Sequence, residues 1–281
     1  MLLRNYKSAL LSLAIVSLLG ATAVSTSAEA RERQDRKSSQ KEENRYPDAA
    51  REQPKVKGSP KLQKKLQSMV DAYNKDDFAA ARALADEIIA TEAATAYDRS
   101  VAGQIGSQAA YNTDDTAGTI AYLKRAIEEN ALDNNSHYQL MYMLAGVQLQ
   151  EDQFAEGLAT LDRYFAETKS QKPEDLVLKG QALYQSERYA EAIPVLKQAI
   201  DSSPEPKDNW LQLLMASYAE AGQAGEATKL AESIAAKSPD DKKAQLNLAN
   251  VYLQADQYDK AAVVMEKLRS AGQLTEEKDY R

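Results

Sequence analysis

The sequence contains no cysteine, one histidine and one tryptophan. Without cysteine there can be no disulfide framework, no thiolate metal site and no acyl-cysteine lipid anchor. The single histidine, His137, has no second histidine or cysteine with which to form a zinc site or an ordinary nucleophilic triad. We therefore expect no metal and no cofactor, and we place His137 at a solvent-exposed junction between two helical repeats.

Long apolar runs are also scarce, and the one that stands out lies within residues 1–30. Arg4 and Lys7 precede a mostly apolar run over residues 9–19, which is too short to cross a bilayer. A tail of small residues then ends in Ala-Glu-Ala at residues 28–30. This layout predicts a signal peptide cleaved after residue 30 and export to the periplasm of a Gram-negative bacterium, with a lone membrane anchor as the alternative. The mature chain has no other run of membrane-spanning length, so we expect a soluble or peripherally held product.

Positive charge is scarce over most of the chain. The formal net charge is −7, and residues 61–281 alone carry −11, which argues against nucleic acid as a partner. Residues 31–60 carry +3, hold almost no large apolar side chain, and are predicted to form a disordered charged tether. An electrostatic arm for anionic lipid or cell wall is the alternative interpretation of this segment. Ser59 and Pro60 predict the cap and first position of the first helix.

From residue 61 onward, apolar spacing predicts helices of about a dozen residues joined by tight turns. A signature of an aromatic residue followed three positions later by a small one begins at residues 78, 154, 189 and 258. The intervals are 76, 35 and 69 residues, which fit a period of about 34–38 with degenerate copies at residues 116 and 224. Two residues before each copy lie Asp76, Asp114, Asp152, Glu187, Gly222 and Asp256, and five of these six are Asp or Gly, which tolerate or stabilise a tight turn. Six repeats are predicted, over residues 62–99, 100–137, 138–172, 173–207, 208–241 and 242–275.

The fourth repeat shows the full pattern in Leu176, Gly180, Leu183, Tyr189, Ala192, Leu196, Ala199 and Pro204. With this pattern and period the chain resembles the tetratricopeptide repeat (TPR) family, and in particular an exported bacterial member. The resemblance implies an all-α fold, a right-handed α-solenoid of about six helical hairpins over residues 61–275. Residues 276–281 look like the start of an incomplete further repeat or a capping helix, so we expect either a truncated product or a partner that covers this end.

Catalytic constellations are not evident in the sequence. The acidic residues at the repeat turns have a structural explanation, and Gly103 and Gly106 lack the lysine and hydroxyl residue of a phosphate loop. Close helix packing explains the two glycines, and core packing near a helix start explains Trp210. We therefore predict that the chain is not an enzyme.

A TPR array presents a concave groove lined by the first helix of each hairpin, and tyrosine and amide side chains there suit a peptide. The alternative is that these tyrosines only pack between repeats. The predicted groove residues are Tyr73, Gln104, Gln108, Tyr111, Tyr142, Gln181, Tyr184, Gln212 and Asn250. Some TPR proteins clamp a C-terminal carboxylate with Lys, Asn and Arg, but of the matching positions here only Asn250 fits, so a chaperone tail is not predicted.

The function we expect is that of a periplasmic adaptor or scaffold that binds a protein or peptide partner of the cell envelope. The layout of export signal, charged arm and repeats resembles TPR companions of envelope machines, including those of TonB-type transport. The alternatives are a scaffold for cell-wall or polysaccharide-export machinery and a non-catalytic regulator of an envelope enzyme. Self-association through the C-terminal end is a further expectation.

Overall fold

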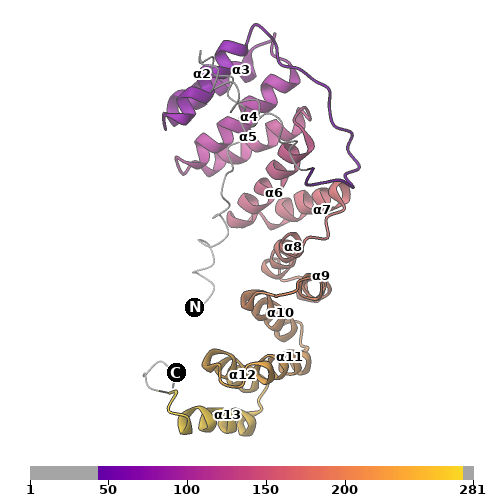
Figure 1. Cartoon of the computed structure of the whole chain (residues 1–281), viewed down its shortest axis with the longest axis vertical. Helices are drawn as coiled ribbons and strands as arrows, with labels where there is room; N and C mark the ends of the chain where they lie inside the picture. The colour runs from indigo at the N-terminus through magenta and orange to yellow at the C-terminus, as the bar shows by residue number, and fades with distance from the viewer. Residues whose placement is uncertain (1–43, 275–281) are drawn as a thin grey trace, which may run out of the picture. The chain divides into compact units, whose positions relative to one another are not determined.

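The computed structural model describes residues 44–274, and these form twelve α-helices without a strand (Figure 1). The helices follow one another as six hairpins: α2 (Gln63–Asn74) with α3 (Phe78–Ala90), α4 (Ala96–Tyr111) with α5 (Thr116–Glu128), α6 (Asn134–Gln150) with α7 (Phe154–Thr168), α8 (Pro173–Gln185) with α9 (Tyr189–Asp201), α10 (Asp208–Glu220) with α11 (Ala224–Lys237), and α12 (Lys242–Gln254) with α13 (Tyr258–Ser270). The predicted all-α fold of six hairpins is confirmed.

The predicted signal peptide (1–30) and C-terminal repeat start (276–281) lie outside the described residues. No helix within 44–274 has the length and apolar character needed to cross a membrane.

The turn inside each hairpin has the same geometry. All six residues predicted at these turns adopt a left-handed backbone conformation, with φ between 56° and 73°. In the first hairpin the Asp76 N–H bonds to the Tyr73 carbonyl and the Asp77 N–H to the Ala72 carbonyl, both at 3.0 Å. This is a Schellman motif, which satisfies carbonyl groups at the end of a helix. The same pair of bonds ends every leading helix, meaning the first helix of each hairpin: α2, α4, α6, α8, α10 and α12.

Helix starts agree with the predicted repeat boundaries at residues 173, 208 and 242, but not in the first half. There α4 and α6 begin at residues 96 and 134, four residues before the predicted 100 and 138. Side-chain caps explain both shifts: the Thr95 hydroxyl accepts from the Asp98 N–H, and the Asp133 carboxylate accepts from the Ser136 N–H.

The predicted cap at Ser59 and Pro60 is wrong. Helix α2 begins at residue 63, and Ser59 lies in a preceding turn that is closed by the Leu62 N–H at 3.0 Å. The N–H of Ser59 donates to the Asp98 carboxylate, so Ser59 is held by α4 and caps no helix.

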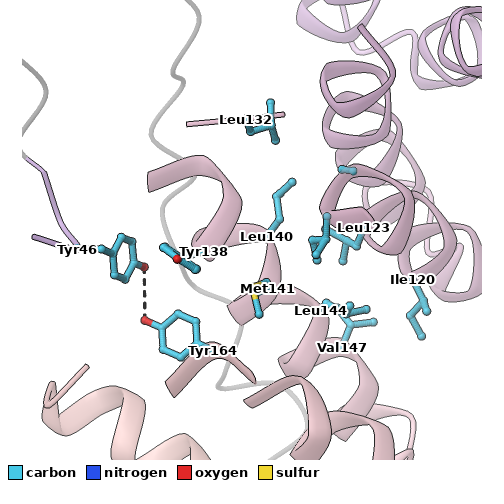
Figure 2. Packing of buried hydrophobic residues seen from close by; sticks show 12 residues of the cluster. Tyr46, Ile120, Leu123, Leu132, Tyr138, Leu140, Met141, Leu144, Val147 and Tyr164 are labelled. Atoms are coloured by element: carbon cyan, nitrogen blue, oxygen red, sulfur yellow. Dashed lines mark hydrogen bonds between the residues drawn. The ribbon is translucent and has the colours of Figure 1, made fainter. Parts of the chain in front are cut away.

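The described chain divides into two compact units, which we call the first unit (residues 44–169, α2–α7) and the second unit (residues 170–274, α8–α13). The core of the first unit includes Leu123, Met141 and Tyr164, each at most 1% exposed (Figure 2). In the second unit a cluster around Met215, Leu248 and Tyr252 lies between α10, α11, α12 and α13. Each unit therefore has its own hydrophobic core.

Small residues set the spacing of the helices. A Cβ atom on Gly103 would lie 2.9 Å from the carbonyl oxygen of Tyr122, and one on Gly106 would lie 2.7 Å from the ring of the same tyrosine. The two glycines thus let α4 approach α5 closely, which is the packing role predicted for them. Trp210 is 4% exposed near the start of α10, as also predicted.

Residues 44–59 form an N-terminal strap over the first unit. In Figure 1 this indigo segment runs from beside α6 and α7 to the start of α2. Tyr46 is buried and Arg51 bonds to Asn130 and Asn134, so a disordered tether does not describe this part of residues 31–60. The low apolar content led to the wrong prediction because one tyrosine and one arginine provide the docking. Residues 31–43 lie outside the described residues.

Candidate functional site

The nine predicted groove residues all lie on leading helices, and we call them the leading-helix set. Eight are partly buried and Asn250 is exposed. The first unit holds Tyr73, Gln104, Gln108, Tyr111 and Tyr142. The second unit holds Gln181, Tyr184, Gln212 and Asn250. Each group is considered as a surface of its own unit.

Helix α4 shows why such residues form a stripe. Gln104, Gln108 and Tyr111 are spaced by four and three positions and so lie on one face of the helix. The residues around them, such as Ile105 and Ala109, are at most 3% exposed. A helix that is buried on most sides therefore presents one partly open line of amides and a tyrosine.

The first-unit tyrosines have partners that orient them. The Tyr73 hydroxyl accepts a 3.3 Å hydrogen bond from the Asn112 side chain, and its ring centroid lies 5.6 Å from that of Phe78. Because Asn112 follows α4 directly, this bond joins the C-terminal ends of α2 and α4. Tyr142 packs edge-on against Tyr164 at 5.8 Å. These tyrosines both pack and present part of their surface, as the intermediate burial indicates.

In the second unit, Tyr184 packs edge-on against Tyr189 at 5.2 Å. Burial raises the pKa of the Tyr184 hydroxyl, and the nearby Glu220 and Tyr189 add to the effect, so this group stays a neutral donor at physiological pH. Gln212 lines a cavity of about 30 Å³ between α10, α11 and α12, together with Met215 and Asn247. That volume holds only a few water molecules, so any ligand of this surface must lie outside the cavity.

The leading-helix set therefore offers neutral hydroxyl and amide groups on partly apolar surfaces. Such groups can donate to and accept from a peptide backbone, and tyrosine adds contact area at low conformational cost. Among residues 44–274 no group of three or more His, Asp or Glu side chains is placed to hold a metal. The arrangement suits recognition of a chain segment.

The prediction of a solvent-exposed His137 is wrong. The side chain is 0% exposed, and neither ring nitrogen has a hydrogen-bond partner among the described residues. Burial lowers the pKa of His137 to about 3, and the nearby Arg51 and Arg163 guanidinium groups contribute. The early start of α6 places His137 inside the helix, and the strap crosses the same turn, where its Arg45 N–H bonds to Asn135.

A second set of contacts was missed at the sequence level, namely the docking of Tyr46 and Arg51 near Asn130 and Asn134. The available signal was Tyr46, the one aromatic residue within residues 31–60, followed by a proline. A lone aromatic in a polar segment is a candidate anchor for docking, although its target depends on the folded structure.

Family models and solved structures agree with this architecture. A family model described as a tetratricopeptide repeat-like domain matches residues 3–217, and one described as a tetratricopeptide repeat matches residues 218–277. No protein of curated function matches the sequence.

Among solved structures, a tetratricopeptide repeat protein from Parabacteroides merdae is 12% identical, with coverage of 75% of this chain and 80% of that chain and a TM-score of 0.54. MamA from Desulfovibrio magneticus is 16% identical, with coverage of 63% and 97% and a TM-score of 0.51. These likenesses concern the fold alone. Because the first family model covers more than half of the chain, the protein belongs to the tetratricopeptide repeat-like family.

Proposed function

We propose that this protein is an exported adaptor that binds an extended or helical segment of an envelope protein through its leading-helix set. The observation that carries the proposal is that each unit presents partly exposed tyrosine and amide side chains on its leading helices, in α4 on a helix that is buried on most other sides. The TPR fold supports a scaffold for protein–protein interaction. The signal-like residues 1–30 support the periplasmic location.

The adaptor role is tested by crosslinking and pull-down from the periplasm with the full-length chain. We expect a defined envelope protein to be enriched, and components of TonB-type transport are the first candidates to examine. Combining Tyr142→Ala with Tyr184→Ala should weaken capture about tenfold while helicity is retained, because each substitution removes an aromatic contact on one unit. Lys197→Ala, at an exposed position of α9 outside the leading helices and the C-terminal hairpin, serves as the control.

Other outcomes would redirect the proposal. A collapse of the melting temperature in the double variant would show that the two tyrosines are core residues and would remove the site. Retention on peptidoglycan or exopolysaccharide with no enriched protein would favour the cell-wall or polysaccharide-export scaffold. Enrichment of an enzyme whose turnover changes on binding would favour the regulator.

Export has a separate test. Fractionation of the native host should place the mature chain in the periplasm, and N-terminal sequencing should begin at Arg31. Retention of residues 1–30 in a membrane fraction would contradict cleavage and favour an anchor.

We also propose self-association through the C-terminal hairpin. Leu253, Tyr258 and Val263 are 46%, 61% and 71% exposed, and they lie on α12 and α13. A contiguous exposed apolar patch marks a contact surface, and the proposal is that these side chains contribute to one. Sedimentation of the wild-type chain should show concentration-dependent association that Val263→Glu removes, and a monomer at all concentrations would contradict the proposal.

A further inference from the structure

The N-terminal strap is held to the first unit mainly through two side chains. The first is Tyr46, which is 9% exposed. Its ring meets those of Tyr138 and Tyr164 edge-on, at 5.0 and 6.1 Å, and the Tyr46 and Tyr164 hydroxyl oxygens lie 3.4 Å apart (Figure 2). Edge-to-face aromatic contacts of this kind add specificity to the burial of apolar surface. Tyr46 therefore occupies an aromatic pocket between α6 and α7.

The second side chain is Arg51, which lies at the corner between α5 and α6. Its guanidinium group donates to the Asn130 carbonyl at 3.0 Å, the Leu132 carbonyl at 2.8 Å and the side-chain oxygens of Asn130 and Asn134 at 2.6 and 2.5 Å. The Asn134 amide donates back to the Arg51 carbonyl at 3.1 Å. All four acceptors are neutral, and the corner follows the C-terminal end of α5, where the helix dipole favours a cation.

Backbone N–H groups next to Tyr46 and Arg51 also hold the strap against the first unit. The Ala50 N–H donates to the Glu167 carbonyl at 2.8 Å, and the Arg45 N–H donates to the Asn135 side chain at 3.0 Å. Beyond Arg51, most residues from 52 to 57 are exposed. A short segment with a hydrogen-bonded turn at residues 46–49, held by an aromatic and an arginine with main-chain bonds beside them, has the form of a bound peptide.

We propose that the corner between α5 and α6, together with α7, is a peptide-binding site that the chain's own residues 44–51 occupy in cis. The ligand it takes is a peptide that presents a tyrosine at the start of a turn and, five residues later, an arginine. This site shares no residue with the leading-helix set, although Tyr142 of that set packs against Tyr164 of the pocket. The proposal stands whether or not that set binds a partner.

The covalent link explains why such a site would be closed in the free protein. A tethered ligand acts at an effective concentration in the millimolar range, so a competing peptide must exceed that concentration or bind more tightly. Removing the two cis side chains should open the site without altering the residues that form it.

The test uses the full-length chain and a fluorescent synthetic peptide with the sequence of residues 44–56 as the probe. The open variant carries Tyr46→Ala and Arg51→Ala. Fluorescence anisotropy should show at least tenfold tighter binding of the peptide to the open variant than to the wild-type chain. A control peptide with alanine in place of its tyrosine and arginine should not bind. Adding Asn130→Ala and Asn134→Ala to the open variant should abolish binding of the probe.

Equal binding to the open variant and the wild-type chain, or equal binding of probe and control peptide, would overturn the proposal. If the open variant loses its helicity, the proposal is tested instead by hydrogen exchange of the wild-type chain, which measures whether the strap is released reversibly. Exchange at the Arg45 and Ala50 amides that is faster than at the amides of α6 and α7 would show reversible release of the strap. Exchange of both amides only with global unfolding would make the strap a permanent part of the fold and overturn the site.

Discussion

The two units of the molecule are built from the same hairpin but stabilised differently. Helices α4, α6 and α7 of the first unit have 16, 17 and 15 residues, whereas those of the second unit have 13 or 14. The first unit buries polar side chains such as Asp98, His137 and Gln148 and carries the strap. The second unit shows the aromatic and small-residue pattern in two of its three hairpins, with copies that start at Tyr189 and Tyr258. The strap and its polar contacts thus add to the packing of the first unit.

Ion pairs show the same contrast. In the first unit Arg99 pairs with Glu129 through two nitrogens, at 2.7 and 2.9 Å, and the side chains are 24% and 12% exposed. In the ion pairs described in the second unit, both side chains are at least 42% exposed. Exposed pairs contribute little to stability, so the second unit depends on its apolar contacts.

The largest loss of stability is expected when a substitution places a charge in the apolar packing of the second unit. Ala192 is 0% exposed in α9, and Ala192→Glu should lower the free energy of unfolding by about 4 kcal/mol because it buries an unpaired carboxylate. Hydrogen exchange should show early opening of α8 and α9. The matched control is Ala190→Glu at an exposed position of the same helix. Unchanged stability in the Ala192 variant would mean that the helix register is wrong.

The second-largest loss of stability is expected in the first unit alone, when the strap loses its arginine. Arg51→Ala removes the hydrogen bonds between the strap and the corner, with an expected loss of about 2 kcal/mol. Arg51→Lys should recover only part of it, since an ammonium group lacks the planar fork. Hydrogen exchange in α6 and α7 measures the loss, with Arg45→Ala on the exposed part of the strap as control. An equal response in the second unit would contradict the assignment.

A pH effect should also separate the units, because His137 is the sole histidine. Its pKa of about 3 in the folded state lies below the ordinary value of 6.5, so the unfolded state takes up the proton first. The contribution of neutral His137 to the free energy of unfolding is fully present above pH 6.5 and is lost as the pH falls toward 3. The charged groups around His137 are Arg51 of the strap, Arg163 of α7 and Asp133 before α6.

Between pH 6.5 and 5.5 the loss should be about 1 kcal/mol in the first unit, before ordinary carboxylates are protonated. Chemical denaturation at the two pH values, followed by hydrogen exchange in α6, measures it. His137→Gln should remove this pH dependence. A variant that keeps the full dependence would show that another group is responsible.

The smallest expected effects concern the ion pairs. Arg99→Ala should cost roughly 1 kcal/mol, because the pair is bidentate and partly buried. Lys229→Ala, which breaks an exposed pair with Glu226 in α11, should leave the melting curve unchanged. Thermal unfolding followed by circular dichroism compares the two, and a larger effect of Lys229→Ala would reverse the contrast between the units.

The hairpin turns and the second-unit boundaries were predictable because their causes are local. Five of the six residues at positions 76, 114, 152, 187, 222 and 256 are Asp or Gly, which tolerate a left-handed backbone, and each of the six follows a helix of the expected length. The starts of α4 and α6 were predicted four residues late because the capping side chains at Thr95 and Asp133 were not recognised. The leading-helix set was placed on the intended helices, and its binding role stays a prediction.

The amino-acid sequence by itself determined the helical hairpin, its repeat and the turn that closes each leading helix, since these depend on residues within one repeat length. The tertiary structure alone decided the burial of His137 and the docking of the strap. Tyr46 meets Tyr164 across 118 positions, and Arg51 meets Asn134 across 83. A local pattern carries no information on which distant carbonyl groups and rings a folded chain will bring together. The site of the strap is therefore a property of the fold, built from residues that look like a solvated tether when read in order.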